Sequence, residues 1–200
     1  MDSINKKISP FDQKIIKYHY GLNSLYYYCF ISTAKTSISK MQNVYSEQEL
    51  DYFKLIINKV IENTEVFITP RDALNLSAEV PNKLLKIRAQ FLLDKWLCSH
   101  YFFKNTDDKI YLGPKILNEF KELFQGQEIE YIKCCSLCDD IAIWVILNLL
   151  TMTIFIKIVL FQGTRCYKCN TIFHDACIQK FLVRSTKCPS CNDTFANPML

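Results

Sequence analysis

The chain has 200 residues, half of them hydrophobic, which is enough to build the cores of one to two small domains. Its formal net charge of +4 is mild, so it permits weak nucleic-acid contact without arguing for it and disfavours a DNA-binding regulator. Of the ten cysteines, only Cys29 and Cys98 lie outside the last third of the chain. The first residues contain no apolar segment of the kind that forms a signal peptide. This distribution favours metal-bound thiolates in a reducing compartment over a secreted disulfide scaffold.

Residues 1–43 indicate the end of a domain rather than a whole one. Two segments rich in Ile, Tyr and Phe, residues 14–20 and 24–31, flank the turn-forming sequence Gly-Leu-Asn, so the pattern predicts a β-hairpin. A hairpin alone is only marginally stable in water. The aromatic run at 26–28 therefore needs a core or a partner surface, and we interpret this region as the remnant of a truncated domain.

A helix is predicted to begin at Ser46, because Ser46 and Glu49 have the spacing of a capping box, in which each side chain satisfies a backbone amide of the other residue. Apolar residues then recur at helical spacing at Leu50, Phe53, Ile57, Val60 and Ile61. A second helix is predicted from Pro70, with Thr69 as its cap.

A third helix is predicted after Pro81, with two apolar rows along it. The rows are Leu84, Ile87 and Phe91, and Leu85, Ala89, Leu92 and Trp96. Residues 96–103 are predicted to form a strand, the polar run at 104–109 a turn, and residues 110–112 the returning strand. Gly113 and Pro114 then begin a last helix.

Three helices followed by a two-stranded hairpin is the order of a winged helix-turn-helix domain, which we assign to residues 44–130. The third helix would be its recognition helix and residues 104–109 the tip of its wing. The basic residues of that helix region are Lys83, Lys86, Arg88 and Lys95. They indicate a solvated face or, alternatively, phosphate contact. No base-reading cluster is visible, and the wide apolar surface favours protein docking.

The stretch 134–191 contains eight residues of the types that bind zinc, arranged in four pairs. The pairs are Cys135 with Cys138, Cys166 with Cys169, His174 with Cys177, and Cys188 with Cys191. Two residues between ligands suit a tight turn that directs both donors at one tetrahedral Zn²⁺. Four pairs complete two sites, so we predict two Zn²⁺ per chain. Disulfide-bonded or buried cysteines are the alternative, which the regular spacing disfavours.

The order of the ligands resembles that of a RING domain, in which the pairs interleave as a cross-brace. The first and third pairs then hold one metal ion, and the second and fourth pairs hold the other. This assigns one site to Cys135, Cys138, His174 and Cys177, and the other to Cys166, Cys169, Cys188 and Cys191. Two independent sequential fingers would use the same eight ligands, and a histidine in fifth place favours the cross-brace.

RING domains perform no covalent chemistry themselves. They hold a ubiquitin-charged conjugating enzyme (E2) so that a substrate lysine attacks its thioester, and the resemblance therefore implies no catalytic residue in this chain. It implies E2 contacts at Leu137, around Phe181 and at Pro189, which correspond to the apolar position between the first two ligands, the central helix and the last loop. The alternative roles of Phe181 and Pro189 are core packing and turn shape.

Four stretches resemble the Nse1 family, the non-structural maintenance of chromosomes element 1 subunits of the Smc5/6 complex. They are residues 33–41, 91–97, 110–120 and 166–195, the last with the C4HC3 ligand order. The resemblance implies a nuclear, chromatin-associated RING-type E3 ubiquitin ligase subunit that acts in DNA repair by homologous recombination. The implied partners are the MAGE-type Nse3 subunit, Nse4, the Smc5/6 core and a ubiquitin-charged E2, with weak or indirect contact with DNA. The alternative is a non-catalytic, zinc-stabilised interaction module of the same complex.

The patterns together predict an α+β fold, with a winged-helix domain followed by a small C4HC3 RING-type cross-brace zinc domain at 133–195. Two winged helices precede the RING in the Nse1 family. The resemblance therefore makes residues 1–43 the hairpin end of the first one.

The gap between Cys138 and Cys166 departs from the family, because residues 141–161 form a nearly continuous apolar run long enough to span a bilayer. A span would place the first two ligand pairs on opposite sides of a membrane, which the cross-brace forbids, so we predict no membrane contact and reject a membrane-anchored ligase. We interpret residues 144–160 as a translated intron, because their removal leaves a family-like loop. An apolar loop folded onto the domain is the alternative.

Overall fold

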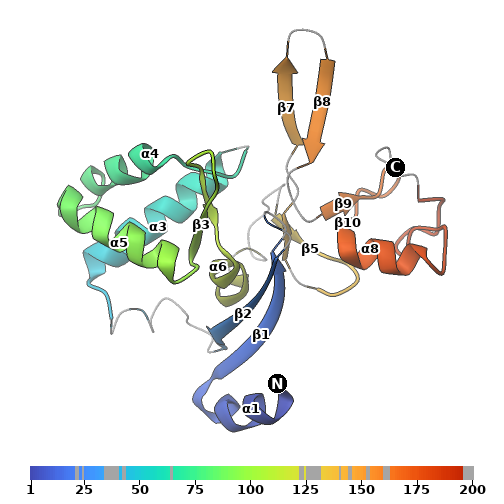
Figure 1. Ribbon diagram of the computed structural model, residues 1–200, viewed down its shortest axis with the longest axis horizontal. Helices are drawn as coiled ribbons and strands as arrows, with labels where there is room; N and C mark the ends of the chain where they lie inside the picture. The colour runs from blue at the N-terminus through green and yellow to red at the C-terminus, as the bar shows by residue number, and fades with distance from the viewer. Residues whose placement is uncertain are drawn as a thin grey trace. The chain divides into compact units, whose positions relative to one another are not determined.

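Figure 1 shows the chain as a computed structural model. The structure describes residues 1–20, 23, 25–33, 41, 44–63, 65–121, 124, 132–139, 141–143, 146–151, 154–159 and 163–195, with only the backbone at 132 and within 143–159. The chain divides into two compact units, Met1–Tyr18 with Tyr26–Phe120 and His19–Leu25 with Lys121–Leu200. The domain boundaries expected from the sequence, at 1–43, 44–130 and 133–195, stay predictions.

A helix and a hairpin precede the winged helix. From the N-terminus to Phe120 the elements are α1 (Asp2–Ile8), the 3-10 helix η1 (Ser9–Phe11), β1 (Gln13–Tyr20), β2 (Leu25–Ser32), α3 (Glu47–Glu62), α4 (Pro70–Asn75), the 3-10 helix η2 (Leu76–Ala78), α5 (Lys86–Cys98), β3 (Phe102–Lys104), β4 (Ile110–Leu112) and α6 (Pro114–Glu119). The hairpin of β1 and β2 is confirmed to within one residue at each strand end. α1 was not predicted, and Asn5 holds it to β1 through two hydrogen bonds with the backbone of Ile15, at 2.9 and 2.8 Å.

The starts of α3 and α4 follow the predicted caps. The Ser46 hydroxyl accepts a hydrogen bond from the Glu49 amide at 3.4 Å, and the Glu49 carboxylate accepts one from the Ser46 amide at 2.9 Å, so the capping box is confirmed. Thr69 caps α4 through the Asp72 amide. The buried face of α3 is rotated from the predicted one, because Tyr52 and Ile56 lie in the core, whereas the expected Ile57 and Ile61 are only half-buried.

The third helix differs from its prediction at both ends and on one face. It begins at Lys86 and continues to Cys98, so the strand expected from residue 96 starts only at Phe102. The end is set by His100, whose left-handed φ of 58° lets the next amide, that of Tyr101, bond back to the Trp96 carbonyl at 3.0 Å. Of the row predicted as Leu85, Ala89, Leu92 and Trp96, the last three are buried together with Leu93, whereas Leu85 precedes the helix and is 78% exposed. The other row is not buried, and Ile87 is 87% exposed.

The wing follows α5 as predicted. β3 and β4 pair antiparallel with Phe102 opposite Leu112, and Ile68 adds two backbone hydrogen bonds to Ile110, at 2.9 and 2.8 Å. At Gly113 the chain turns into α6 so tightly that a Cβ atom would lie 2.4 Å from the His100 carbonyl oxygen, so only glycine fits there. Aromatic rings from α3, α5 and β3 fill the core, with Phe53 at its centre, 4.8 Å from Trp96.

The C-terminal part consists of short hairpins and one helix. Its elements are β5 (Ile132–Cys134), β6 (Ile141–Ile143), β7 (Ile146–Thr151), β8 (Ile154–Val159), β9 (Gly163–Arg165), β10 (Ile172–His174) and α8 (Asp175–Leu182). The strands pair as β5–β6, β7–β8 and β9–β10, all antiparallel. The fold is therefore α+β, with a winged-helix domain followed by a RING-type domain, as the sequence predicts.

The apolar segment between the first two cysteine pairs forms a hairpin in its backbone. Ile146 of β7 lies opposite Val159 of β8, and the two strands pair along their whole length (Figure 1). Among the described residues, no helix has the length and apolar character needed to cross a bilayer. The interpretation of residues 144–160 as a translated intron stays a prediction, and residues 144, 145, 152, 153 and 160 lie outside the described part of the chain.

Candidate metal centre

Eight side chains gather into two groups of four within the C-terminal unit. One group is Cys135, Cys138, His174 and Cys177, and the other is Cys166, Cys169, Cys188 and Cys191. Within each group the potential ligand atoms all lie within 4.8 Å of one another. The first ligand pair of the sequence thus meets the third, and the second meets the fourth. This is the interleaved arrangement of a cross-brace, and it differs from two sequential fingers.

Each C-x2-C pair lies on the same kind of tight turn. The residue after the second cysteine has a left-handed φ, 60° at Asp139, 58° at Asn170 and 60° at Asn192. Its amide donates a hydrogen bond to the carbonyl of the first cysteine of the pair, at 2.8, 2.9 and 3.0 Å respectively. Asp and Asn tolerate this conformation better than other non-glycine residues. The sequence prediction missed these three residues, although an Asp or Asn directly after each C-x2-C is visible in the sequence.

The first site contains the histidine, and its second ring nitrogen has a partner. His174 Nε2 donates to the carbonyl oxygen of Ile141 at 2.9 Å, while Nδ1 lies 3.2 Å from Cys138 Sγ and 3.9 Å from Cys177 Sγ. A bond at Nε2 leaves the Nδ1 lone pair for a metal, as in many metal-binding histidines. His174 ends β10 and occupies the N-cap position of α8, so the strand and the helix meet at this residue of the first site.

The second site has the spacing expected for thiolates around one ion. Cys166 Sγ lies 3.8 Å from Cys191 Sγ, and Cys169 Sγ lies 3.8 Å from Cys188 Sγ. Two sulfurs bound tetrahedrally to Zn²⁺ at about 2.3 Å would be separated by roughly the same distance. A disulfide needs sulfurs about 2.05 Å apart, and all ten cysteines are free thiols. The donor set therefore fits zinc.

The environment of the sulfurs favours a bound cation. Hydrogen bonding to Thr171 lowers the pKa of the Cys169 thiol to about 6. Burial raises the pKa of the Cys177 and Cys188 thiols, because a low-dielectric site disfavours their charged form. Four crowded sulfurs therefore cannot all ionise by themselves. A divalent cation would supply the missing positive charge and keep them deprotonated.

A small apolar core lies between the two sites. Phe173 is fully buried, and Ile172, Ile178 and Ala142 pack around it with three of the ligand cysteines. Outside these side chains, Thr164 of β9 donates a hydrogen bond to Asp175 in the first turn of α8. A core this small needs further stabilisation, which a metal ion bound at each of the two groups would supply.

The three residues predicted to contact an E2 lie in different surroundings. Leu137, in the turn of the first cysteine pair, is 37% exposed. Phe181 of α8 packs against the core cluster and is half-buried, and Pro189, in the turn of the last pair, is half-buried as well. Neither their E2 contacts nor zinc ligation by the eight Cys and His residues is tested by this geometry, and both stay predictions.

Two protein-family models match parts of the chain. A family model described as "Nse1 non-SMC component of SMC5-6 complex" matches residues 1–120. The chain belongs to the Nse1 family. A second model, for a RING-like domain, matches residues 157–191. Neither of these two models covers residues 121–156, which hold the first cysteine pair and β7.

Curated Nse1 relatives extend the match along the chain. A protein of Drosophila melanogaster named "Non-structural maintenance of chromosomes element 1 homolog" is 30% identical over 198 residues, covering 98% of this chain and 76% of its own. The proteins of the same name from Rattus norvegicus and Homo sapiens are each 25% identical over 169 residues, covering 83% of this chain. The chain spans 56% of the length of these two mammalian relatives.

A solved structure shares the fold. A chain of a structure titled "Nse1-Nse3-Nse4 complex" superposes with a TM-score of 0.62 at 20% identity, covering 98% of this chain and 78% of that one. The likeness supports the order of a winged helix followed by a RING-type domain.

Proposed function

We propose that this Nse1-family chain is the RING-type E3 ubiquitin ligase subunit of an SMC5-6 complex. It would hold a ubiquitin-charged E2 and promote transfer of ubiquitin to a substrate lysine. The observation that carries the proposal is the interleaving of two four-ligand groups in a domain that matches a RING-like family model. Family membership supplies the complex, because the family is described as a component of it.

The two groups would bind one Zn²⁺ each. Nδ1 of His174 and the sulfurs of Cys135, Cys138 and Cys177 would form one site, and the four sulfurs of Cys166, Cys169, Cys188 and Cys191 the other. Zinc at such closed sites stabilises the fold and takes no part in bond making. The chain would therefore contribute a surface that binds the E2.

The reaction itself takes place between other molecules. The substrate lysine amine attacks the thioester carbonyl on the E2, an isopeptide bond forms, and the E2 cysteine leaves as a thiolate. This chain would position the E2, with Leu137 as the exposed apolar contact and Phe181 and Pro189 shaping the surface beside it. No catalytic residue is required of it.

The partners follow from the family. We infer that the chain assembles with the MAGE-type Nse3 subunit, with Nse4 and with the Smc5/6 core, because the similar solved structure is titled as an Nse1-Nse3-Nse4 complex. Such an assembly would act in DNA repair by homologous recombination on nuclear chromatin. Contact of this chain with DNA would be weak or indirect within that role.

A second candidate is a zinc-stabilised interaction module of the same complex without ligase activity. Phe181 favours it, because this residue packs against the core and leaves less apolar surface for an E2 than an exposed side chain would. The two candidates predict the same zinc content. They differ in ubiquitin transfer.

Reconstitution with Nse3 and Nse4 partners tests both candidates. Two zinc ions per chain and partner-stimulated discharge of an E2 are expected for the ligase, and Leu137→Asp should lower the discharge rate by about ten-fold or more. The matched control is Tyr167→Asp, because Tyr167 is 79% exposed in the turn of the second cysteine pair and is assigned no E2 contact. Two zinc ions with no discharge across a panel of E2 enzymes would favour the module, and equal loss in the two variants would reject Leu137 as a contact.

A further inference from the structure

One face of β2 carries three exposed aromatic side chains at alternate positions. Tyr26, Tyr28 and Phe30 are 57%, 67% and 51% exposed. Successive side chains of a strand point to opposite faces, so these three share one face and follow each other at about 7 Å. Large aromatic rings are usually buried, so a row of three on the surface needs a function.

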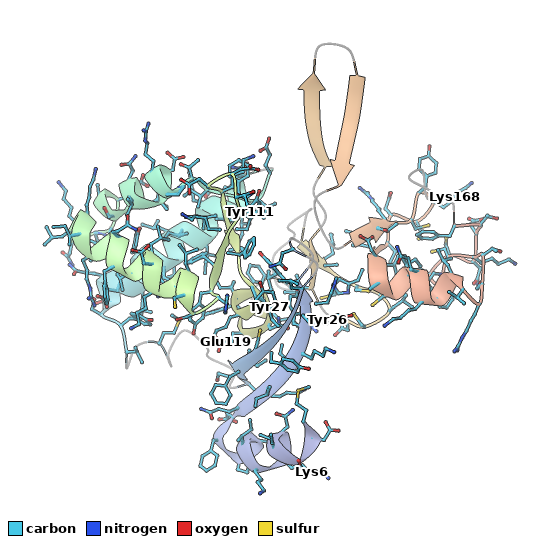
Figure 2. All side chains as sticks on the ribbon, viewed as in Figure 1. Lys6, Tyr26, Tyr27, Tyr111, Glu119 and Lys168 are labelled. Atoms are coloured by element: carbon cyan, nitrogen blue, oxygen red, sulfur yellow. The ribbon has the colours of Figure 1, made fainter. Side chains whose placement is uncertain are left out.

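The opposite face of β2 is anchored within the first unit. Cys29 is buried, and burial raises the pKa of its thiol. The Tyr27 ring meets His100 edge-on, with ring centroids 5.3 Å apart. The Ser32 amide donates a hydrogen bond to Glu119 of α6 at 3.2 Å, and Figure 2 labels both Tyr27 and Glu119. The winged-helix elements therefore support this strand, which gives the exposed rings a fixed direction.

The charge around the exposed rings is positive. Lys17 of β1 is exposed, and its ammonium lies 4.4 Å from the centre of the Tyr26 ring. Lys14 lies three positions earlier in the same strand, so its side chain points to the opposite face. Neither β1 nor β2 contains an Asp or Glu residue. The face therefore presents three rings and a cation, and neither strand adds a carboxylate that would repel a polyanion.

We propose that this face binds single-stranded nucleic acid without sequence preference. Bases stack on Tyr26, Tyr28 and Phe30, and a phosphate lies near Lys17. A row of rings beside a cation suits unpaired bases, because every base has a π-face and the stacking is tolerant of sequence. In a duplex the bases are stacked on one another, so their faces are not available to the aromatic rings. The proposal is independent of ubiquitin transfer, since all four residues lie in the first unit.

Fluorescence anisotropy with the full chain and labelled oligonucleotides tests the proposal. The probes are oligo-dT and oligo-U of about twelve nucleotides and a duplex of the same length. Tighter binding of either single strand than of the duplex is expected, and the two single-stranded arms show whether DNA or RNA is preferred. Tyr28→Ala and Phe30→Ala should each weaken binding about ten-fold. Lys17→Ala should reduce the slope of log Kd against log salt by about one, whereas Lys14→Ala, on the opposite face of β1, should leave the slope unchanged.

Two controls separate stacking from other causes. Tyr28→Leu keeps apolar area but has no π-face, so it should weaken binding as much as Tyr28→Ala. Phe91→Ala removes a ring of α5 that is 54% exposed, and it should leave binding unchanged. Wild-type affinity in Tyr28→Leu, an equal loss in Phe91→Ala, equally tight duplex binding or no single-strand binding would each overturn the proposal and leave a protein-docking face. Because all these side chains are exposed, circular dichroism should show an unchanged fold.

Discussion

The ring of His174 and the carbonyl oxygen of Ile141 are joined by a 2.9 Å hydrogen bond, and this bond leaves Nδ1 as the nitrogen that faces the sulfurs of the first site. Ile141 belongs to β6, so the ligand geometry of the first site depends on a strand that ends directly before residues 144–160. The second site has no ligand in common with the first. The two sites should therefore respond separately to mutation.

His174→Ala should leave one zinc ion per chain out of two. The first site loses its only nitrogen ligand, whereas the ligands of the second site are intact. His174→Cys is the matched variant, because it retains a donor at this position and should keep both ions. Zinc is measured by atomic absorption after gel filtration. Loss of both ions from His174→Ala would show that the sites form only together.

Deletion of residues 144–160 should preserve both zinc sites and reduce binding of the dye ANS. All eight ligands lie outside the deleted segment, and the register of β5–β6 and β9–β10 does not involve it. Dye binding should fall because the deletion removes a long run of apolar residues from a domain with a small core. A variant with a Gly/Ser linker of equal length separates apolar character from length. A drop in zinc content after the deletion would show that the segment is part of the domain.

Glu49→Ala should lower the free energy of unfolding by roughly 2 kcal/mol. The Glu49 side chain is 9% exposed, and it both completes the cap of α3 and pairs with Arg88, whose Nε lies 2.6 Å from Oε1. Glu49→Gln keeps an acceptor for the Ser46 amide and removes only the charge. Its loss in free energy of unfolding, measured by urea denaturation, should therefore be about half that of Glu49→Ala. Equal losses in the two variants would mean that the cap contributes nothing.

Alkaline pH should destabilise the first unit, because three of its tyrosines are buried as neutral phenols. Burial raises the pKa of Tyr111 to about 12 and raises the pKa of Tyr52 and Tyr101 in the same direction. A raised pKa in the folded state means that the neutral phenol is favoured there, so stability is full below about pH 10, where an unfolded tyrosine titrates, and falls as the pH rises toward 12.

Tyr111→Phe tests this pH dependence. The variant should have a flatter decline of Tm between about pH 10 and about pH 12, because it has no phenol to ionise. An unchanged decline would assign the alkaline loss to Tyr52 and Tyr101 alone. The wild-type chain at pH 7 to 9 is the reference, since the phenols of both chains are neutral there.

The features that the sequence predicted well are those with a local chemical signature. One is the interleaved grouping of the Cys and His pairs from Cys135 to Cys191, and the other is the Ser46 capping box. The end of α5 had no such signature, because a histidine takes the left-handed position where a glycine would have signalled it. Both apolar rows of α5 fit the helical period, so periodicity alone could not tell which row faces the core.

Long-range partners could not be predicted either. Glu49 and Arg88 are 39 residues apart, and nothing in the spacing of either residue indicates the other. The same is true of the hydrogen bond between His174 and the Ile141 carbonyl, which involves backbone that any residue supplies. The Asp and Asn residues after the cysteine pairs are a different case, since their pattern is visible in the sequence once the turn geometry is known.

The position of His174 also bears on the free-energy cost of inserting residues between Cys138 and Cys166. This residue lies opposite Gly163 in the β9–β10 register, and its ring donates a hydrogen bond to the Ile141 carbonyl. The segment from Ile141 to Gly163 therefore contacts His174 at both of its ends. Closure entropy grows only with the logarithm of loop length, and lengthening the gap between Cys138 and Cys166 from ten residues to 27 costs about 1 kcal/mol. The RING-type fold therefore tolerates an insertion here. Residues can be added there at little thermodynamic cost, whereas an insertion inside a C-x2-C turn would destroy a site.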